Sequence, residues 1–441
     1  LESSSLRQQH SNVVCPGCAC LCDDIQLPTD STGILDFEPP CELGRRWFES
    51  NWSQPSSVAT VGGKDCDFDE AIAAAAELLR ECDYPLIYGL SRSATPGQRA
   101  AVALGEFLGG AVDTTASLCH GPSIMAIQEM GEVTCTLGEV KNRADLVIFW
   151  GCNPASSHPR HSERYSVTAT GKFIPGGRDD RKVVMIGDAS NLNEWKIDDA
   201  GTEPDLKIPV PTGTDYEVLS QLTHALRLGD DSILDDLPPE WKELAALVRA
   251  SQYGIIFFGL GLAETGAWGG TRRSGTGHVN VAALLHLVAE LNAVTRFSAR
   301  RMRLQGDVSG ADNVLCWQST YPFSVDYSRG YPRYNPGEYT ANELLERGDT
   351  DCLILVGAET VPYFTDRAKE NLRKTPTILL DYPNNAHELA PAVSFSTAVY
   401  GIHARATAYR MDNVPLTLRQ LTSSKLPTDE QVLSDLLKQL Q

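Results

Sequence analysis

DLVIFWGCN, residues 145 to 153, is a continuous apolar run that ends in glycine and then turns polar. A short apolar run bounded in this way is typical of a strand that is buried on both faces, as in a parallel sheet covered by helices. DCLILVGAE at 351 to 359 has the same form. The two matching strand exits predict ligand sites at the carboxyl ends of parallel strands.

Other segments of the chain alternate between the same kind of strand and amphipathic helices. We expect further strands at 84–90, 183–188, 254–262 and 377–385, and helices at about 96–108 and 278–291. Strands that alternate with helices predict an α/β fold with parallel sheets. Because the second half repeats the pattern of the first, we expect two Rossmann-like, doubly wound domains with the same strand order.

The composition limits the size, compartment and partners of the protein. A chain of 441 residues is too long for one core and predicts roughly two to four domains. The net charge of −19 disfavours nucleic acid and anionic membranes as partners. No run of about 18 apolar residues occurs, and the first residues do not resemble a signal peptide, so we expect a cytoplasmic protein.

Four cysteines crowd the segment NVVCPGCACLCDDI at 12 to 25. Cys15, Cys18 and Cys22 follow the spacing C-x2-C-x3-C, and Cys41 lies in PPCELGRRW further on. Four converging thiolates suit a [4Fe–4S] cluster, and zinc would also accept them. The spacing favours the cluster over zinc and over free structural thiols, and Cys20 is not expected to be a ligand. We therefore expect a small iron–sulfur region at residues 1–58.

The rest of the chain is expected to fold as Rossmann-like segments around a shared crevice. The expected divisions are 59–200 for the first segment of domain I, 201–350 for the second domain with crevice loops, and 351–441 for the segment that completes the duplicated core.

Loops at the strand exits, GLSRSATPG, WGCNPASSHPRH, GLGLAETGAWGG and GAETVPYF, are expected to line that crevice. In the second and third of these loops we expect Gly151, Asn153, Arg160, Gly259 and Gly261 to contact a cofactor. Glycines also end strands without binding anything, so the loops alone do not identify a ligand.

Two further features bear on the chemistry. One local stretch of this acidic chain is rich in arginine: Arg272, Arg273, Arg300, Arg301 and Arg303. This excess predicts an anionic, phosphate-bearing ligand, although a solvated charged face would have the same composition.

The turn SLCHGPS at 117 to 123 sets Cys119 beside His120 at a predicted helix start, where the thiolate is favoured as a metal ligand or nucleophile. By spacing alone, a Cys-His pair is more often structural.

Taken together, several segments resemble the B subunit of formylmethanofuran dehydrogenase, within the molybdenum and tungsten bis-pterin oxidoreductases. The resemblance covers nearly the whole chain and rests on the N-terminal cysteines, SLCHGPS, WGCNPASSHPRHSERYS, RMRLQGDVSG, YPFSVDYSRGYPRYNPGEYTANELL and GIHARATAYRMDNVP. It implies a tungsten or molybdenum ion held by two pterin guanine dinucleotides and Cys119. It also implies His120 as proton handler and Arg303 as carboxylate anchor. The implied ligands of a [4Fe–4S] cluster are Cys15, Cys18, Cys22 and Cys41.

The implied reaction is reversible reduction of CO2 to formate, the precursor of formylmethanofuran. The implied partners are an amidohydrolase-type A subunit and C- and D-type subunits that include a β-barrel over the pterin site, with small one-carbon substrates.

GDASN at 187 to 191, LDYPNNAH at 380 to 387 and LQGDVSG after Arg303 depart from the family pattern where nucleotide groups should bind. An alternative is therefore a redox-silent scaffold subunit of a formyltransferase/hydrolase complex. A third is an iron–sulfur electron carrier without pterin.

Overall fold

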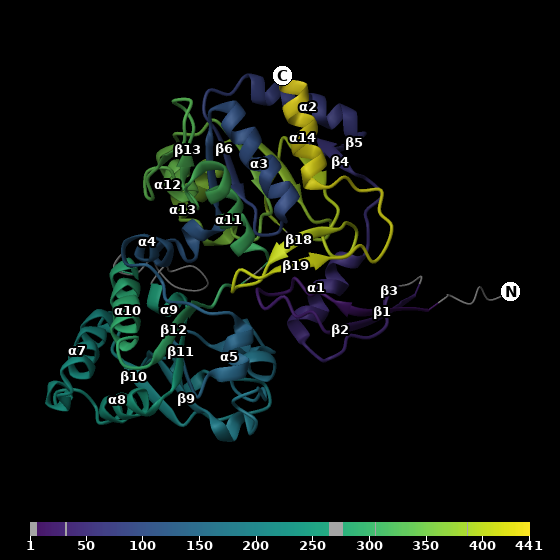
Figure 1. Ribbon diagram of the computed structural model, residues 1–441. Coiled ribbons are helices and arrows are strands. Elements are labelled where there is room, and N and C mark those ends of the chain that lie inside the picture. The colour runs from purple at the N-terminus through teal and green to yellow at the C-terminus, as the bar shows by residue number, and fades with distance from the viewer. Residues whose placement is uncertain (1–6, 31–32, 264–276, 305, 386) are drawn as a thin grey trace. The chain divides into compact units, whose positions relative to one another are not determined.

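The computed structural model describes residues 7–30, 33–263, 277–304, 306–385 and 387–441. The chain divides into two compact units (Figure 1). Unit 1 comprises residues 1–118 and 305–441, and unit 2 comprises residues 119–304. Both are mixtures of helices and strands, so the chain has a mixed α/β fold with several sheets.

Unit 2 is built on a sheet of five parallel strands. Their order across the sheet is β10 (Leu206–Val210), β9 (Lys182–Asp188), β8 (Leu146–Trp150), β11 (Tyr253–Phe258) and β12 (Arg296–Arg301). The chain begins at the central strand β8, moves outward to β10, and then crosses back to β11. The direction of winding therefore reverses between β8 and β11, which is where ligands bind in open α/β sheets.

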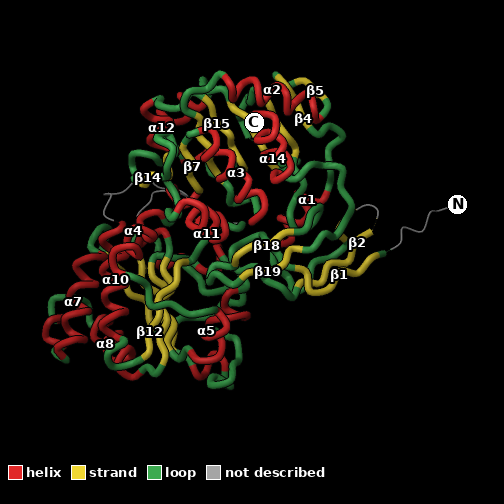
Figure 2. The backbone as a smooth tube through the Cα atoms, turned by 45° about the horizontal axis from the view of Figure 1, so that its top comes forward, coloured by secondary structure: helices red, strands yellow, loops and turns green. Residues whose placement is uncertain are grey.

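Helices lie on both sides of this sheet (Figure 2). Every residue of β8 and β11 is buried, which explains their unbroken apolar sequences. Alternate side chains such as Leu146, Ile148 and Ile256 join one apolar core with three helices, α7 (Asp215–Leu228), α8 (Glu240–Ala250) and α10 (Gly277–Leu291). On the other side lies α5 (Leu137–Arg143), whose first turn is fixed by a capping box of Thr136 and Glu139. The remaining elements are α4 (Gly121–Met130), α6 (Pro154–Ser157), η2 (Ser162–Ser166), η3 (Gly177–Asp180), η4 (Leu192–Glu194), η5 (Asp231–Leu234) and α9 (Leu260–Ala263).

Unit 1 contains a nine-stranded sheet whose central part is parallel. The order is β14 (Arg333–Tyr334), β13 (Val325–Asp326), β7 (Ala111–Thr114), β6 (Pro85–Gly89), β15 (Cys352–Val356), β16 (Thr377–Asp381), β17 (Val393–Ser396), β4 (Ala59–Val61) and β5 (Lys64–Cys66). The strands outside β7 and β17 are antiparallel to their neighbours. Winding reverses here between β6 and β15.

The central strands of unit 1 alternate their side chains between two cores. Ile87 and Ile354 pack with four helices, α2 (Phe68–Arg80), α3 (Thr95–Leu108), α11 (Val308–Ser319) and α14 (Asp429–Leu440). Leu86 and Leu353 pack on the opposite face with α12 (Ala341–Arg347) and α13 (Asp366–Leu372). This period of two is expected for strands covered on both faces.

The N-terminal part of unit 1 forms a small sheet of β1 (Gln8–Val13), β2 (Ile25–Asp30) and β3 (Gly33–Ile34), followed by α1 (Glu42–Trp52). A separate hairpin comprises β18 (Ala406–Tyr409) and β19 (Pro415–Leu418), and two short 3-10 turns are η1 (Thr115–Leu118) and η6 (Val361–Tyr363). None of the helices that the structure describes combines the length and apolar character needed to cross a bilayer.

Each predicted strand and helix is present, although β11 ends at Phe258 and is followed by α9, and β16 ends at Asp381, both short of the predicted ends; their grouping also differs from the prediction. β8 and β9, assigned from sequence to the segment 59–200, lie in the sheet of unit 2 beside β11 and β12. The parallel strands of the two sheets also do not share one order. The first parallel strand in sequence is β8 in unit 2, where it lies between the second and fourth strands, and β6 in unit 1, where it lies between the second and third. The predicted equal strand order is therefore wrong. An apolar run identifies a buried strand but carries no information about the strand that pairs with it.

Candidate functional site

The N-terminal cysteines lie in a loop between β1 and β2. Cys15, Cys18 and Cys22 are buried in this loop, and Cys41 is the residue that precedes α1. The Cys15 amide donates to the Cys22 carbonyl at 2.8 Å, and the Leu21 amide donates to the Cys18 carbonyl at 3.1 Å. These two bonds fold the loop back on itself, as the spacing and Gly17 predict.

Charge interactions identify the thiols that surround Cys15. Burial raises the pKa of Cys15 well above its usual range, and Cys22, Cys18 and Cys41 raise it further. The Gly17 amide donates to the Cys15 sulfur at 3.4 Å. A side chain at Gly17 or Gly44 would place its Cβ 3.3 or 3.0 Å from that sulfur, so both positions favour glycine. The four predicted ligands are thus neighbours.

The donor chemistry of this loop fits a thiolate-bound cluster, because three other thiols lie close enough to Cys15 to raise its pKa, and all four are potential thiolate ligands. Within the described part of the chain, however, no group of three or more Cys, His, Asp or Glu side chains is gathered tightly enough to hold a metal ion as it stands. A single ion needs its ligands around one point, whereas each thiolate of a [4Fe–4S] cluster binds a different iron atom.

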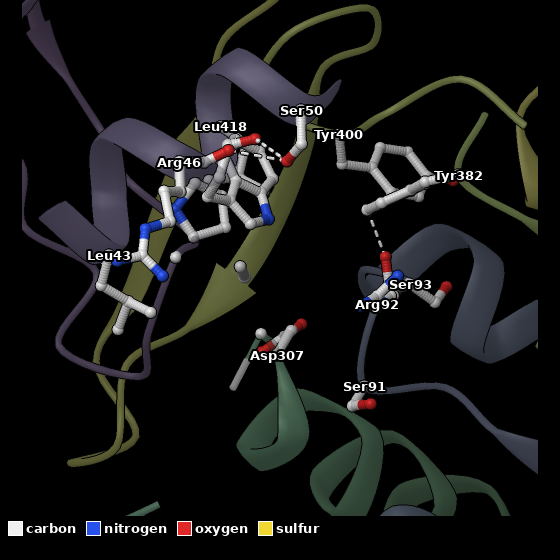
Figure 3. Close-up of a pocket in the computed structure, with 15 residues that line it drawn as sticks. Leu43, Arg46, Ser50, Ser91, Arg92, Ser93, Asp307, Tyr382, Tyr400 and Leu418 are labelled. Carbon is white, nitrogen blue, oxygen red and sulfur yellow. Dashed lines mark hydrogen bonds between the residues drawn. The ribbon is translucent and has the colours of Figure 1, made fainter. Parts of the chain in front are cut away.

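A pocket of about 210 Å³ adjoins the cysteine loop in unit 1 (Figure 3). It lies at the carboxyl edge of the nine-stranded sheet, beside the exit of β6. Its lining residues come from the cysteine loop, α1, the strand exits and the C-terminal hairpin: Pro16, Gly17, Leu43, Arg46, Trp47, Ser50, Ser91, Arg92, Ser93, Gly306, Asp307, Tyr382, Tyr400, Ala408 and Leu418.

Arg92 is fixed at this pocket by two buried carboxylates. Its Nε lies 3.3 Å from Glu359 Oε2, and its NH1 lies 3.6 Å from Asp381 Oδ1. Ser91 also donates to Glu359, and the Tyr382 hydroxyl donates to the Arg92 carbonyl. Burial raises the pKa of Glu359, while Arg92 opposes that shift. Since the two acids offset the guanidinium charge, the pocket offers aromatic walls and hydrogen-bonding groups rather than a strongly cationic surface.

In unit 2, the exits of β8 and β11 pack backbone against backbone. The Gly259 amide donates to the Trp150 carbonyl at 2.9 Å, and the Gly261 amide donates to the Gly151 carbonyl at 2.9 Å. Gly151 has φ +64°, and a Cβ there would lie 2.5 Å from the Leu262 amide nitrogen. A Cβ at Gly259 would lie 2.5 Å from the Gly151 carbonyl oxygen. These predicted glycines are therefore required by close packing at the point where winding reverses.

Two buried histidines hold the backbone that follows β12. His120 Nε2 lies 3.3 Å from the Met302 carbonyl oxygen, and His158 Nε2 lies 2.5 Å from the Arg303 carbonyl oxygen. Because a carbonyl can only accept, each Nε2 carries the proton. Each Nδ1 then accepts from a serine hydroxyl, Ser123 at 3.0 Å for His120 and Ser157 at 2.8 Å for His158.

Both histidines are neutral at pH 7. Burial lowers the pKa of His120 well below its usual range, and the charges of Arg303 and Arg301 lower it further. Burial also lowers the pKa of His158 to about 4, although its bond to the Arg303 carbonyl opposes the shift. Neutral rings match the pattern of one donated and one accepted bond for each imidazole.

The predicted catalytic residues Cys119, His120 and Arg303 all belong to unit 2, and all three are buried. Cys119 directly precedes His120, the residue that caps α4. Asn153 caps α6 and accepts from the Lys196 amide at 3.1 Å, while the buried Arg160 pairs through Nε with Glu163 at 2.5 Å.

Among the clustered arginines, Arg300 and Arg303 are buried, which contradicts a solvated face for these two residues. Arg300 donates to the Cys135 carbonyl at 2.8 Å. The positive charges of Arg301 and Arg303 both act on His120. Arg272 and Arg273 lie outside the described residues.

Sequence reasoning did not single out His158 or the pocket residues Trp47, Tyr382 and Tyr400. His158 stands in the quoted loop SSHPRH, beside the serine that orients it, and that Ser-His pair was a usable signal. The three aromatic residues come from separate segments and had no shared local pattern.

Comparison with known proteins finds relatives over nearly the full length. The chain is 36% identical over 442 residues to the B subunit of tungsten-containing formylmethanofuran dehydrogenase 2 from Methanocaldococcus jannaschii, covering 97% of this chain and 98% of that protein. It is 34% identical over 441 residues to the protein of the same name from Methanococcus maripaludis, covering 97% and 98%.

More distant similarity extends to a second complex. The B subunit of the formyltransferase/hydrolase complex Fhc from Methylorubrum extorquens is 23% identical over 309 residues, covering 69% of this chain and 76% of that protein. The fold matches a chain in the crystal structure of the FhcABCD complex from that organism with methylofuran, at a TM-score of 0.67 and 20% identity, covering 87% of this chain and 98% of that chain. No protein-family model matches the sequence.

Proposed function

The chain belongs to the family of formylmethanofuran dehydrogenase B subunits, and from that premise we propose that it is the catalytic subunit of such a complex. Its reaction would be reversible reduction of CO2 to formate at a tungsten or molybdenum bis-pterin centre. The observation that carries the proposal is the joint burial of Cys119, His120 and Arg303 beside the strand exits of unit 2.

Cys119 is the proposed protein ligand of the metal. A thiolate is a soft donor, and the adjoining N-terminus of α4 favours negative charge on its sulfur. When bound, the metal–pterin group would supply the two-electron reduction of CO2, for which amino-acid side chains alone are not suited. Burial of Cys119 would keep water away from the ligand.

His120 is the proposed proton handler. Its ring is neutral, and its Nδ1 accepts from Ser123, so a proton can enter the imidazole through that hydroxyl. The bond from Nε2 to the Met302 carbonyl fixes the ring plane. A ring held in one tautomer at a buried position can take up a proton without first reorienting.

Arg303 is the proposed carboxylate anchor. A guanidinium can donate two parallel hydrogen bonds to a carboxylate, which suits formate. The flanking carbonyls of Met302 and Arg303 are held by His120 and His158, so the backbone that carries the anchor is fixed on both sides. Burial, and after it the charge of Arg303, lowers the pKa of His120, so an anionic substrate on Arg303 would relieve part of that shift.

In unit 1, the four N-terminal cysteines are the proposed ligands of a [4Fe–4S] cluster that carries electrons. The neighbouring pocket combines Trp47, Tyr382 and Tyr400 with hydrogen-bonding groups, which suits a flat polar heterocycle such as a pterin. We further propose that both units are Rossmann-like doubly wound domains. Their parallel strands with helices on both faces support this assignment.

The test is metal, iron and pterin analysis of the native complex, together with formate turnover, for Cys119→Ala and Cys135→Ala. Cys135 is a buried thiol of the same unit that lies outside the proposed site. We expect tungsten or molybdenum and turnover to fall to background in Cys119→Ala and to persist in Cys135→Ala. Unchanged turnover in an assembled Cys119→Ala complex would exclude the proposed role.

A scaffold role without redox activity is the second candidate. It is supported by fold likeness to the FhcABCD chain and by the GDASN loop, where Asp188 accepts from the Ser190 amide at 2.9 Å and from Thr212 at 2.5 Å. A carboxylate used within its own loop has less capacity to bind a nucleotide. Absence of heavy metal and iron from the native complex would favour this scaffold, and iron alone would favour an electron carrier.

Partner subunits are proposed from the same family membership. They comprise an amidohydrolase-type A subunit and C- and D-type subunits, one of which contributes a β-barrel over the pterin site. The crystallised complex of the more distant relative is named for four subunits, FhcABCD, which supports a multi-subunit assembly for this chain.

A further inference from the structure

Two thiols outside the proposed site contact each other in unit 1. Cys82 follows α2 and is partly exposed, whereas Cys352 is the first residue of β15 and is fully buried. The Cys352 and Cys82 side chains are hydrogen-bonded, and the Cys82 thiol donates in turn to the Leu78 carbonyl at 3.1 Å. Neither residue takes part in the proposed catalytic chemistry.

The backbone on both sides of this contact is tied together. The Asp351 carboxylate accepts from the Asp83 amide at 2.7 Å and from the Tyr84 amide at 3.0 Å. The Thr350 hydroxyl donates to the Tyr84 carbonyl at 2.9 Å. Two residues further on, Cys352 lies opposite Pro85 in the β6–β15 ladder. The two sulfur atoms are therefore held near each other by a frame that does not depend on the thiols.

The two thiols differ in reactivity. The hydrogen bond with Cys352 holds the pKa of Cys82 below its usual value, and the same bond raises the pKa of Cys352. Because the thiolate is the nucleophile in disulfide exchange, the partly exposed Cys82 is the attacking thiol. Buried Cys352 cannot meet a solution disulfide and can react only with the sulfur of Cys82.

We propose that Cys82 and Cys352 are a dithiol that closes reversibly to a disulfide by exchange with a low-molecular-weight disulfide. The Cys82 thiolate attacks one sulfur of the small disulfide, forms a mixed disulfide and releases one thiolate. The Cys352 sulfur then attacks Cys82, its proton passes to the departing thiolate, and the second small thiol leaves. Two protein thiols are oxidised and one small disulfide is reduced to two thiols.

The surroundings determine which oxidant fits. Carboxylates of Glu81, Asp83 and Asp351 lie close enough to act on the pair. They repel an anionic disulfide such as oxidised glutathione and attract a cationic one such as cystamine. The closed bond would join the end of α2 to the start of β15, at the edge of the sheet opposite the strand exits, so the pocket beside the cysteine loop should keep its shape.

The experiment treats the native complex with cystamine or with oxidised glutathione, then unfolds it, alkylates the free thiols and maps the peptides by mass spectrometry. We expect a Cys82–Cys352 linked peptide that dithiothreitol removes, that forms faster with cystamine, and that raises the denaturant midpoint of unit 1. A mixed disulfide on Cys82 with Cys352 still open to alkylation would overturn the proposal, as would no reaction at Cys82.

Two variants serve as controls. Cys82→Ser should leave Cys352 fully alkylated after unfolding, because the buried thiol has lost its only route to the oxidant. Cys316→Ser removes an exposed thiol elsewhere in unit 1 and should leave the linked peptide intact. Because the exchange uses neither Cys119 nor the N-terminal cysteines, its failure would leave the proposed function unaffected.

Discussion

Replacing Gly151 by alanine tests whether the strand exits of unit 2 are set by backbone packing. Gly151 directly follows β8 with φ +64°, and an added Cβ would lie 2.5 Å from the Leu262 amide nitrogen and 3.0 Å from the Gly261 carbonyl carbon. Neither atom belongs to a flexible side chain. Accommodation therefore requires the exits of β8 and β11 to separate by about 1 Å.

A matched glycine in the same unit separates strain from clash. Gly229 follows α7 with φ +67° and has no other atom within 4 Å of an added Cβ. Alanine in this backbone conformation costs about 1 to 2 kcal/mol, a term that both variants share. Gly151→Ala adds forced displacement of packed backbone, at about 1 to 3 kcal/mol more. That excess corresponds to roughly a 5- to 150-fold change in the local opening equilibrium.

Hydrogen exchange measured peptide by peptide reports this opening equilibrium. In Gly151→Ala the peptides that cover β8 and β11 should exchange faster than in the wild type by at least roughly 5- to 150-fold, because the strain term adds to this excess. Gly229→Ala should leave these peptides nearly unchanged and affect mainly the end of α7. Equal protection of β8 and β11 in the two variants would refute the claim that close backbone packing fixes the exits.

Three further results are expected. Arg181→Met should destabilise unit 2 by at least about 3 kcal/mol in urea unfolding, because this buried guanidinium donates to four backbone carbonyls, and Arg181→Lys should recover only part of the loss. The pKa of His158 lies near 4 in the folded state and 6.5 when exposed, so stability should fall by about 3 kcal/mol as the pH drops from about 6.5 to 4. His158→Gln should flatten that pH dependence, and an unchanged slope would contradict the assignment. Cys18→Ser should lower the iron content and visible absorbance of the native complex, whereas Cys66→Ser should not; an intact spectrum would reassign the ligands.

The elements were predictable from sequence because the central strands are buried on both faces. Each appears as an unbroken apolar run, and a glycine marks the exit of β6, β8 and β15. Pairing was not predictable, because it depends on contacts between distant segments. β6 and β15 are neighbours although more than half of the chain separates them, and β8 pairs with β11 although β9 and β10 lie between them in the sequence.

The site was predictable in its residue types and less so in their partners. Arg160 was among the loop residues predicted to contact a cofactor, whereas His158 was not singled out. In the structure Arg160 is paired with Glu163, whereas His158 reaches the Arg303 carbonyl. A charge–charge pair three residues apart can be anticipated from spacing, but a bond between residues 158 and 303 follows only from the order of β8 and β12 in the sheet.

The two points where winding reverses are built on the same constraint but end in different chemistry. At the first, a Cβ on Gly89 would lie 2.2 Å from the Val356 carbonyl oxygen, and the chain then presents Ser91 and Arg92 to buried carboxylates. At the second, Gly151 meets the exit of β11 directly, and the polar groups come from the neighbouring β12 and α4.

A scaffold subunit would need the glycines in order to close the sheets. It would have no need of a buried arginine whose backbone is fixed by hydrogen bonds from His120 and His158. The distinction between catalyst and scaffold therefore depends on the polar groups beside the glycines. If the chain is a scaffold, the Arg303→Lys complex should assemble and turn over substrate as the wild type does. If the chain is the catalyst, the same complex should assemble normally but lose turnover.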